Sequence, residues 1–320
     1  MTDNGEKLTK NERRAAAREK ARLQHEARIR REKRNRRLTI GGIVIAALAV
    51  VVVVVMVIVN GIRPAAPGPE NMAADGIVVG QGLEAERTDP IPVDGEMVPT
   101  EQTDDILQIV IYQDYMCGAC GTFEQTNGET IRALVEQGLA TVEYHPVSFL
   151  DNSSLGSKYS TRAANAAACV AEHSPDSFFE WNTLMFANQP DQMTTGLEDE
   201  QMIELAGQAG VDTEGEFTDC VRSVHFEDWV RDVVDRLYAE PVPYTYEGGE
   251  EVQALQTPTV LVNGRHYQGP NEDAAVFQGF IQSVQGELEA AGGSDEEGAD
   301  EEASQEPSES PSESETEETP

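Results

Sequence analysis

The sequence predicts one α/β domain of about 215 residues that carries a helical insertion and is preceded by a single transmembrane helix. Three observations support this prediction. A charge-free apolar run separates a basic head from an acidic body. An apolar strand leads directly into a Cys-x-x-Cys pair at the start of a helix, and almost a hundred residues of helical pattern separate two groups of strands.

The formal net charge of -35 is divided unevenly along the chain. Residues 1–37 hold fourteen Lys or Arg against six acids, whereas the rest holds nine against fifty-two. An acidic surface repels phosphates, so nucleic acid is excluded as the partner of the main domain. We interpret the basic head as a cytoplasmic segment that fixes topology, with binding of anionic lipid or nucleic acid as the alternative.

Residues 38–60 are predicted to form a transmembrane signal-anchor helix. Residues 38–59 contain no charge and no proline, and as a helix they reach about 33 Å, enough for a hydrocarbon core of about 30 Å. Basic residues crowd the N-terminal side, so the N-terminus is predicted to be cytoplasmic and the domain extracytoplasmic. The alternatives are a cleaved secretory signal, which usually has a shorter apolar region, and a twin-arginine export signal at Arg36-Arg37.

Three further boundaries follow from composition. Residues 61–75 contain Pro64, Pro67 and Pro69 and are predicted to be a linker. The globular domain is predicted over residues 76–290. Residues 291–320 are acidic and rich in Ser, Glu and Pro, without Lys, Arg or any aromatic or aliphatic residue larger than alanine. Such a segment cannot bury enough apolar surface to fold, so we expect a disordered tail.

The paired cysteines lie where a strand gives way to a helix. Residues 106–112 are a continuous apolar run typical of a strand buried on both faces, and Cys117-Gly118-Ala119-Cys120 follows at a helix start. A helix N-terminus favours a thiolate, and cysteines three apart share one face. We therefore predict Cys117 as an exposed attacking thiol and Cys120 as a deeper resolving thiol.

A bare Cys-x-x-Cys is also half of a zinc site. Zinc would need two further ligands, and neither Cys169 nor Cys220 has a cysteine or histidine partner at ligand spacing. We therefore predict no metal and no cofactor. A purely structural disulfide between Cys117 and Cys120 is a further alternative.

The remaining elements follow the apolar periodicity. A strand is predicted over 141–147, and a helical insertion over about 150–240 contains helices at 161–171, from 178, around 202–206 and over 226–237. Strands return at 259–262 and 265–267, joined by an Asn263-Gly264 turn. A last helix places Phe277, Phe280, Ile281 and Val284 on one face.

This order of elements resembles the DsbA-like thiol-disulfide oxidoreductases, which have a thioredoxin fold with an inserted helical subdomain, and especially their membrane-tethered actinobacterial members. The resemblance covers residues 76–289 and is carried by DYMCGAC at 114–120, VEYHP at 142–146, LMFANQP at 184–190 and QTPTV at 256–260. It implies that Pro258 is cis and faces the cysteines, and that the backbone of Thr257 pairs with substrate. It also implies a structural disulfide between Cys169 and Cys220, for which two buried free thiols are the alternative.

The resemblance implies a membrane-anchored enzyme that forms disulfides in exported, cysteine-containing proteins. Its redox partner would be a quinone-linked membrane protein of the DsbB or vitamin K epoxide reductase type. A reductase or isomerase that uses the same cysteines, and a non-catalytic thioredoxin-like binding module, remain alternatives.

Two departures from the family affect the site. Gly118-Ala119 lacks the proline and the histidine found between the cysteines of relatives, and Ile111 stands where thioredoxin-fold enzymes often have an acid. Asp114 is the nearest acid, expected to be solvated or to cap the helix. With no charge or donor from Gly118-Ala119, we expect the pKa of Cys117 in the upper half of the range of about 3.5 to 7.5 seen for activated cysteines.

Overall fold

The computed structural model describes residues 67–302 except 94, 104, 245, 247 and 248, with the backbone alone from 291, and helical parts of 18–52. The chain divides into two units, Met1–Pro64 and Ala65–Pro320. Much of the predicted membrane span at 38–60 lies outside the described residues. Among those that are described, no helix is long and apolar enough to cross a bilayer.

A five-stranded mixed sheet forms the centre of the second unit, with strand order β1-β3-β2-β4-β5. Strands β2 and β3 are parallel, and the other neighbours are antiparallel. Every residue of β2 is buried, as its continuous apolar run predicts. The short edge strand β1 is not predicted by the sequence analysis. The strands are β1 (Ile77–Val79), β2 (Leu107–Gln113), β3 (Ala140–Pro146), β4 (Thr259–Val262) and β5 (Arg265–His266).

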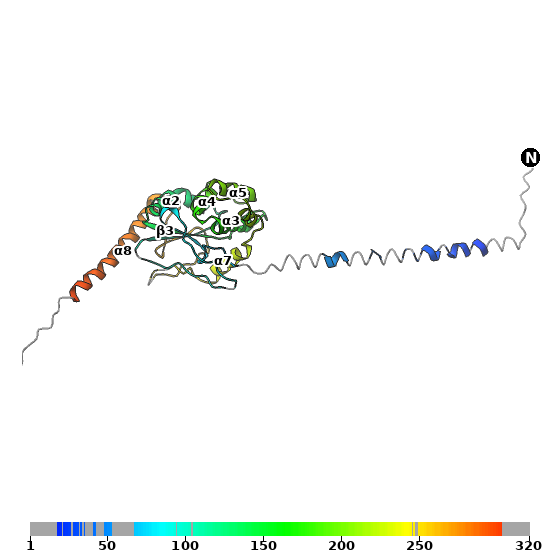
Figure 1. Ribbon diagram of the computed structural model, residues 1–320, viewed down its shortest axis with the longest axis horizontal. Coiled ribbons are helices and arrows are strands. Elements are labelled where there is room, and N and C mark those ends of the chain that lie inside the picture. The colour runs from blue at the N-terminus through cyan, green and yellow to red at the C-terminus, as the bar shows by residue number, and fades with distance from the viewer. Residues whose placement is uncertain are drawn as a thin grey trace, which may run out of the picture. The chain divides into compact units, whose positions relative to one another are not determined.

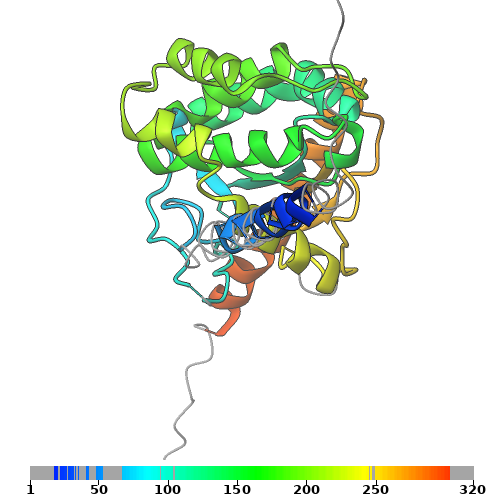
Figure 2. The same ribbon diagram turned by 90° about the vertical axis from the view of Figure 1, so that its right-hand side faces the viewer.

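The predicted insertion is present as five α-helices between β3 and β4, of which α3, α4 and α5 lie together on one side of the sheet (Figures 1 and 2). Helix α2 follows β2 and bears the cysteine pair, while α8 closes the domain. The helices are α2 (Gly118–Glu136), α3 (Tyr159–His173), α4 (Phe178–Ala187), α5 (Asp199–Gln208), α6 (Glu216–Arg222), α7 (Glu227–Ala239) and α8 (Ala274–Glu302).

The two faces of β3 bury different side chains. Tyr144 contacts Phe178 and Phe179 at the start of α4, with ring centroids 5.9 and 6.0 Å apart. On the opposite face, His145 stacks on Tyr112 at 4.3 Å. Helices α2 and α4 lie on one side of the sheet and α7 on the other (Figure 1). His145 is thus a strand residue, as the sequence predicts.

The described part of the predicted linker, residues 67–75, belongs to the folded domain. Met72 is fully buried, and the Asn71 amide donates to the carbonyl of Ala171 at 2.8 Å. The Asp75 carboxylate accepts two hydrogen bonds of 2.6 Å from Arg236 on α7. A linker over 61–75 is therefore wrong in its second half, because these side chains find partners distant in sequence that local composition does not reveal.

The C-terminal boundary also differs from the predicted one. Helix α8 continues to Glu302, twelve residues beyond position 290. An existing helix extends without a new nucleation step, so a stretch with four glutamates can continue it in spite of three glycines. The rest of the predicted disordered tail, residues 303–320, lies outside the described residues.

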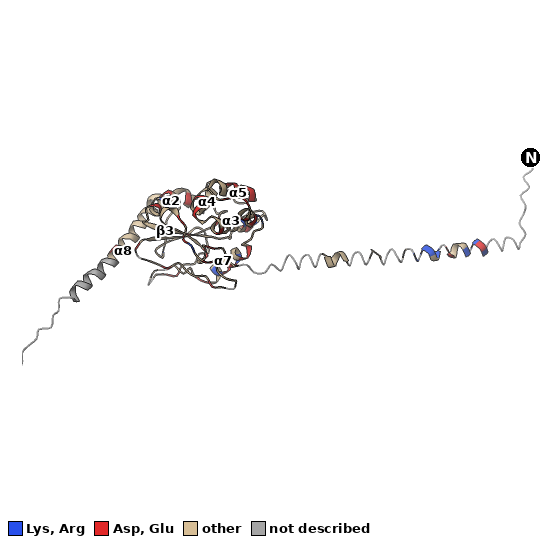
Figure 3. Cartoon of the chain, viewed as in Figure 1, with Lys and Arg blue, Asp and Glu red and all other residues tan. Residues whose placement is uncertain are grey.

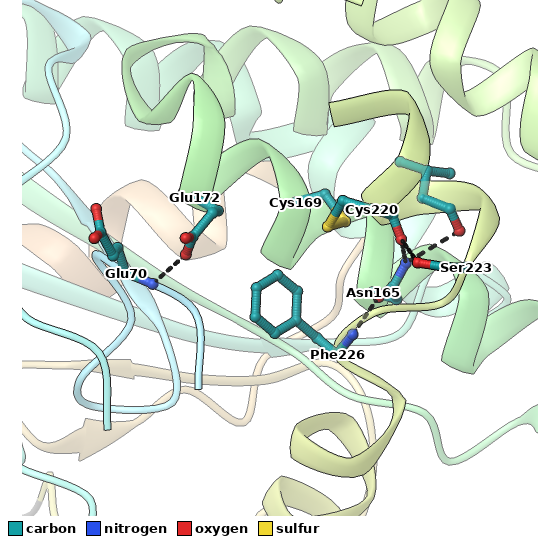
Figure 4. The surroundings of a disulfide bond; sticks show 8 residues. Glu70, Asn165, Cys169, Glu172, Cys220, Ser223 and Phe226 are labelled. Carbon is teal, nitrogen blue, oxygen red and sulfur yellow. Dashed lines mark hydrogen bonds between the residues drawn. A yellow bond between two sulfur atoms is a disulfide. The ribbon is translucent and has the colours of Figure 1, made fainter. Parts of the chain in front are cut away.

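The structure contains a disulfide between Cys169 on α3 and Cys220 on α6, which are 51 residues apart in sequence. Asn165 lies one turn before Cys169 and reinforces the same junction (Figure 4). Its amide nitrogen donates to the carbonyls of Cys220 and Val221, each at 3.4 Å, and its oxygen accepts the Phe226 N–H at 2.8 Å. Helices α3 and α6 of the insertion are therefore joined both by a disulfide and by hydrogen bonds.

Removing this disulfide should destabilise the domain. Closing a loop of 51 residues restricts the unfolded chain, so Cys169→Ala/Cys220→Ala should lower the free energy of unfolding by roughly 2 to 5 kcal/mol. Urea denaturation of the oxidised variant and wild type measures this difference. An unchanged unfolding midpoint, or free thiols at both positions in purified native protein, would contradict the assignment.

Candidate active site

The cysteine pair lies at the junction between β2 and α2. Cys117 has extended backbone angles and is the N-cap residue of α2, and Cys120 lies in the first turn. Both are free thiols. Because the first N–H groups of a helix have no partners within the helix, they are available to a negatively charged sulfur at this point.

The loop before β4 faces Cys117. The peptide bond between Thr257 and Pro258 is cis, and the Thr257 carbonyl accepts a hydrogen bond from Cys117 Sγ at 3.2 Å. The side chain of Cys117 is consequently only 7% exposed, against 2% for Cys120. The prediction of an exposed Cys117 is therefore wrong, because the Thr257 loop covers it. Gly118 and Ala119 are exposed, so the cysteine pair can be approached from the side of these two residues.

The two thiols differ strongly in acidity. A hydrogen bond from the Cys120 thiol lowers the pKa of Cys117 to about 6 against the cost of burial, with help from the Thr257 side chain and from the N–H groups of Cys120 and Ala119. Burial raises the pKa of Cys120 well above its usual value, as do its hydrogen bond to Cys117 and the charge there. At neutral pH the pair holds one thiolate, on Cys117, and one proton, on Cys120. This value lies in the upper half of the predicted range.

Asp114 is fully buried, so the prediction that it is solvated or caps the helix is wrong. Its Oδ1 accepts the Met116 N–H at 2.8 Å and the Ser160 hydroxyl at 2.7 Å, and its Oδ2 accepts the Leu150 N–H at 2.9 Å. Burial raises the pKa of Asp114 to about 6 although these hydrogen bonds oppose the rise, and the Cys117 thiolate adds to it. A buried carboxyl thus titrates in the same pH range as the neighbouring thiol.

Two side chains of the insertion hold the loop that leads into the cysteines. Asn182 Oδ1 accepts hydrogen bonds from Gln113 Nε2 at 2.6 Å and from the Tyr115 hydroxyl at 2.9 Å. Gln189 Nε2 donates to the carbonyls of Tyr115 at 3.1 Å and Cys117 at 2.8 Å. Neither residue is predicted from the sequence to have a role, although Gln189 lies within the LMFANQP match at 184–190.

Glu124 is a second buried carboxyl, one turn after Cys120. Burial raises its pKa to about 7, against a hydrogen bond from Thr183 at 3.3 Å and the charge of Arg132. Its Oε1 lies 3.0 Å from the position that a Cβ on Gly128 would take, so the carboxyl extends away from Cys120. Glu124 is therefore not a substitute for the acid missing at position 111. Sequence reasoning missed it because glutamate in a helix is ordinarily exposed.

The two other cysteines are not available to complete a zinc site, because they are used in the disulfide between α3 and α6. Among the described residues, no group of three His, Cys, Asp or Glu side chains has an arrangement that could hold a metal ion.

Comparison with known proteins shows what this domain is similar to. A family model described as "Thioredoxin" matches residues 103–283, more than half of the chain. The reduced form of the disulfide bond oxidoreductase DsbG from Mycobacterium tuberculosis is 27% identical, with a TM-score of 0.50, covering 68% of this chain and 93% of that one. Reduced DsbA from the same organism is also 27% identical, with a TM-score of 0.46, covering 67% and 99%.

A curated relative in sequence is the serine/threonine-protein kinase PknE of Mycobacterium tuberculosis, 30% identical over 117 residues. The match covers 36% of this chain and only 21% of the kinase, so the chain spans about a fifth of the length of the curated relatives that it matches.

The fold, the reduced cysteine pair at a helix start and the likeness to DsbG define a protein disulfide oxidoreductase. The chain belongs to the thioredoxin family.

Asp114→Asn should lower the pKa of Cys117 below about 6. The interaction between the carboxylate and the thiolate is reciprocal, and removing one of two like charges favours the other anion. Titration of thiolate absorbance in the reduced protein measures this, and the variant should titrate as a single group where the wild type shows a broadened curve. Asp105→Asn, an exposed position at the opposite end of β2, is the matched control. An unchanged or higher pKa in Asp114→Asn would contradict the coupling.

Glu124→Gln should remove part of the pH dependence of stability. Since the pKa of Glu124 is about 7 in the folded protein, against an ordinary value of 4.5, the folded state retains a proton that the unfolded chain releases. The free energy of unfolding therefore falls as pH rises from about 4.5 to about 7, by about 3 kcal/mol in total.

The variant should accordingly be more stable than the wild type at pH 8 and similar to it at pH 4, as measured by urea denaturation at both values. Glu129→Gln, at an exposed position of the same helix, is the control and should not change the pH dependence. A wild-type advantage at pH 8 would argue against a buried, protonated Glu124.

Proposed function

We infer that this protein is a membrane-anchored, extracytoplasmic oxidase that forms disulfides in exported proteins. The observation that carries this inference is the opposite shift of the two thiols, with the pKa of Cys117 lowered to about 6 and that of Cys120 raised. A thiolate stabilised in the reduced form makes the corresponding disulfide a better oxidant. The donors at the start of α2 thus favour transfer of the disulfide to substrate proteins.

The reaction proceeds through a mixed disulfide. A substrate thiolate attacks Cys117 Sγ of the oxidised pair, the bond between Cys117 and Cys120 breaks, and the Cys120 thiolate takes up a proton. A second substrate thiolate attacks the substrate sulfur of the mixed disulfide and releases Cys117 as a thiolate. The substrate loses two electrons and two protons, and the enzyme pair is reduced. A quinone-linked membrane protein of the DsbB or vitamin K epoxide reductase type would accept these electrons.

The Thr257 loop supplies the substrate-binding backbone. Its carbonyl lies 3.2 Å from Cys117 Sγ, so a peptide that pairs with this backbone would pass directly beside the reactive sulfur. Pro258, which follows Thr257, has no N–H of its own to offer to a bound peptide. This arrangement suits an extended segment of a partly folded protein, recognised through its main chain and with little demand on sequence.

The membrane position is inferred from charge and hydropathy. Lys and Arg predominate among the described residues of 18–35, whereas acidic side chains mark the domain, for example on α5 (Figure 3). The uncharged residues 38–59 separate the two. With the basic side in the cytoplasm, the single-pass anchor would hold the catalytic domain outside the membrane, where protein disulfides persist.

Trapping of mixed disulfides tests the roles and the location together. Cys120→Ser should accumulate mixed disulfides through Cys117, because the resolving thiol is absent, while Cys117→Ser should accumulate none. Mass spectrometry of the trapped partners should identify exported, cysteine-containing proteins. Equal trapping by both variants would reverse or remove the assigned roles. Trapping of cytosolic proteins alone would contradict the extracytoplasmic position.

A further inference from the structure

We propose that Gln189 is a positioning residue for the thiol-disulfide chemistry, whose amide fixes the backbone of Cys117 at the start of α2. Through this contact the inserted helices would control the reactivity of the cysteine pair. The inference rests on the disulfide exchange proposed above and adds a residue that acts without contacting either sulfur.

The Gln189 amide spans the residues that lead into the helix. Its two N–H groups point at the carbonyls of Tyr115 and Cys117, at 3.1 and 2.8 Å. The Cys117 carbonyl also accepts the Gly121 N–H at 3.1 Å, the first hydrogen bond of α2. One side chain therefore links the end of the loop to the first turn of the helix. If either carbonyl group were displaced, the Cys117 sulfur would move with the backbone.

Gly121 provides the space for this amide. A Cβ at position 121 would collide with Gln189 Oε1. Only glycine therefore fits at position 121 while the amide stays in place. Glycine inside a helix costs about 1 kcal/mol relative to alanine. The close approach of the Gln189 amide is a physical reason for a glycine immediately after Cys120.

The segment that carries the Gln189 amide is anchored to the last turn of α4. Gln189 comes directly after this helix, and its backbone N–H donates to the Phe186 carbonyl at 3.3 Å. Phe186 and Trp181 of the same helix contact the Tyr115 ring, with centroids 5.0 and 5.4 Å apart. Aromatic packing fixes the Tyr115 end of the contact, and the hydrogen bond to Phe186 fixes the Gln189 end, so the amide can define the position of the loop.

The position of the Cys117 backbone matters because several short-range contacts converge on its sulfur. The N–H groups of Ala119 and Cys120 and a hydrogen bond from the Thr257 side chain favour the thiolate. Hydrogen bonds weaken steeply with poor angles, so a loosened loop would stabilise the thiolate less. The reduced form would then be less favoured, and the disulfide would be a weaker oxidant.

The first test replaces the amide. Gln189→Met keeps the length of the side chain and removes both donors, and Gln189→Glu places a negative oxygen against two carbonyl oxygens. Both variants should shift the equilibrium constant with glutathione toward the oxidised protein, up to tenfold and thus by about 30 mV. The apparent pKa of Cys117, from thiolate absorbance, should rise in both. Asn188→Met is the matched control, because the Asn188 amide bonds the Leu184 carbonyl of its own helix and is exposed.

The second test approaches the contact from the other side. Gly121→Ala should displace the amide and reproduce the shift of Gln189→Met, although alanine favours the helix. In Gly121→Ala/Gln189→Ala the new methyl group has space, but the donors are absent, so the double variant should resemble Gln189→Met and not show the sum of both shifts. Because Gly121→Ala leaves Gln189 in the chain, it tests the contact even if a substitution at position 189 impairs folding.

Three outcomes decide the question. Shifts in Gln189→Met, Gln189→Glu and Gly121→Ala, with none in Asn188→Met, support the proposal. Folded variants at both positions whose equilibrium constants and Cys117 titrations stay within twofold of wild type would overturn it. A wild-type protein that exchanges no disulfide with glutathione would instead overturn the proposed function, so the two failures can be told apart.

Discussion

The site depends on one constraint: the chain between β2 and α2 must be held in a buried turn whose polar groups cannot all be satisfied locally. The inserted helices satisfy them. Ser160 binds the Asp114 carboxylate, Asn182 accepts from the Tyr115 hydroxyl, and Gln189 binds the backbone carbonyls. Buried polar groups without partners are costly. The insertion is therefore needed to stabilise the turn that presents Cys117.

The chemistry of Cys117 results from opposing electrostatic effects in a small volume. Donors from the first turn and from the Cys120 thiol favour the thiolate, while burial and the nearby Asp114 carboxyl oppose a second anion. The balance keeps the thiolate the major form at neutral pH without the extreme stabilisation of the strongest oxidants. In the oxidase that we propose, such a moderate potential would leave the direction of exchange to the redox partner.

Stability and reactivity are supported by different parts of the insertion. The disulfide between Cys169 and Cys220, with Asn165 beside it, joins α3 to α6. The active-site contacts come instead from the first residues of α3 and from the end of α4. A covalent link in one part of the subdomain can therefore limit its unfolding without restricting the exchange of the cysteine pair in the other part.

Apolar periodicity and helix starts are local properties, so the order of the main strands and helices and the place of the cysteine pair are predictable from the amino-acid sequence. The resemblance to a known family indicated the Cys169 and Cys220 pairing and the cis Pro258. The tertiary structure alone decided that Thr257 covers Cys117, that Asp114 and Glu124 are buried acids, and that residues 67–75 belong to the domain. These properties depend on contacts between residues far apart in sequence, and burial of a polar side chain leaves no periodic signal in the segment that contains it.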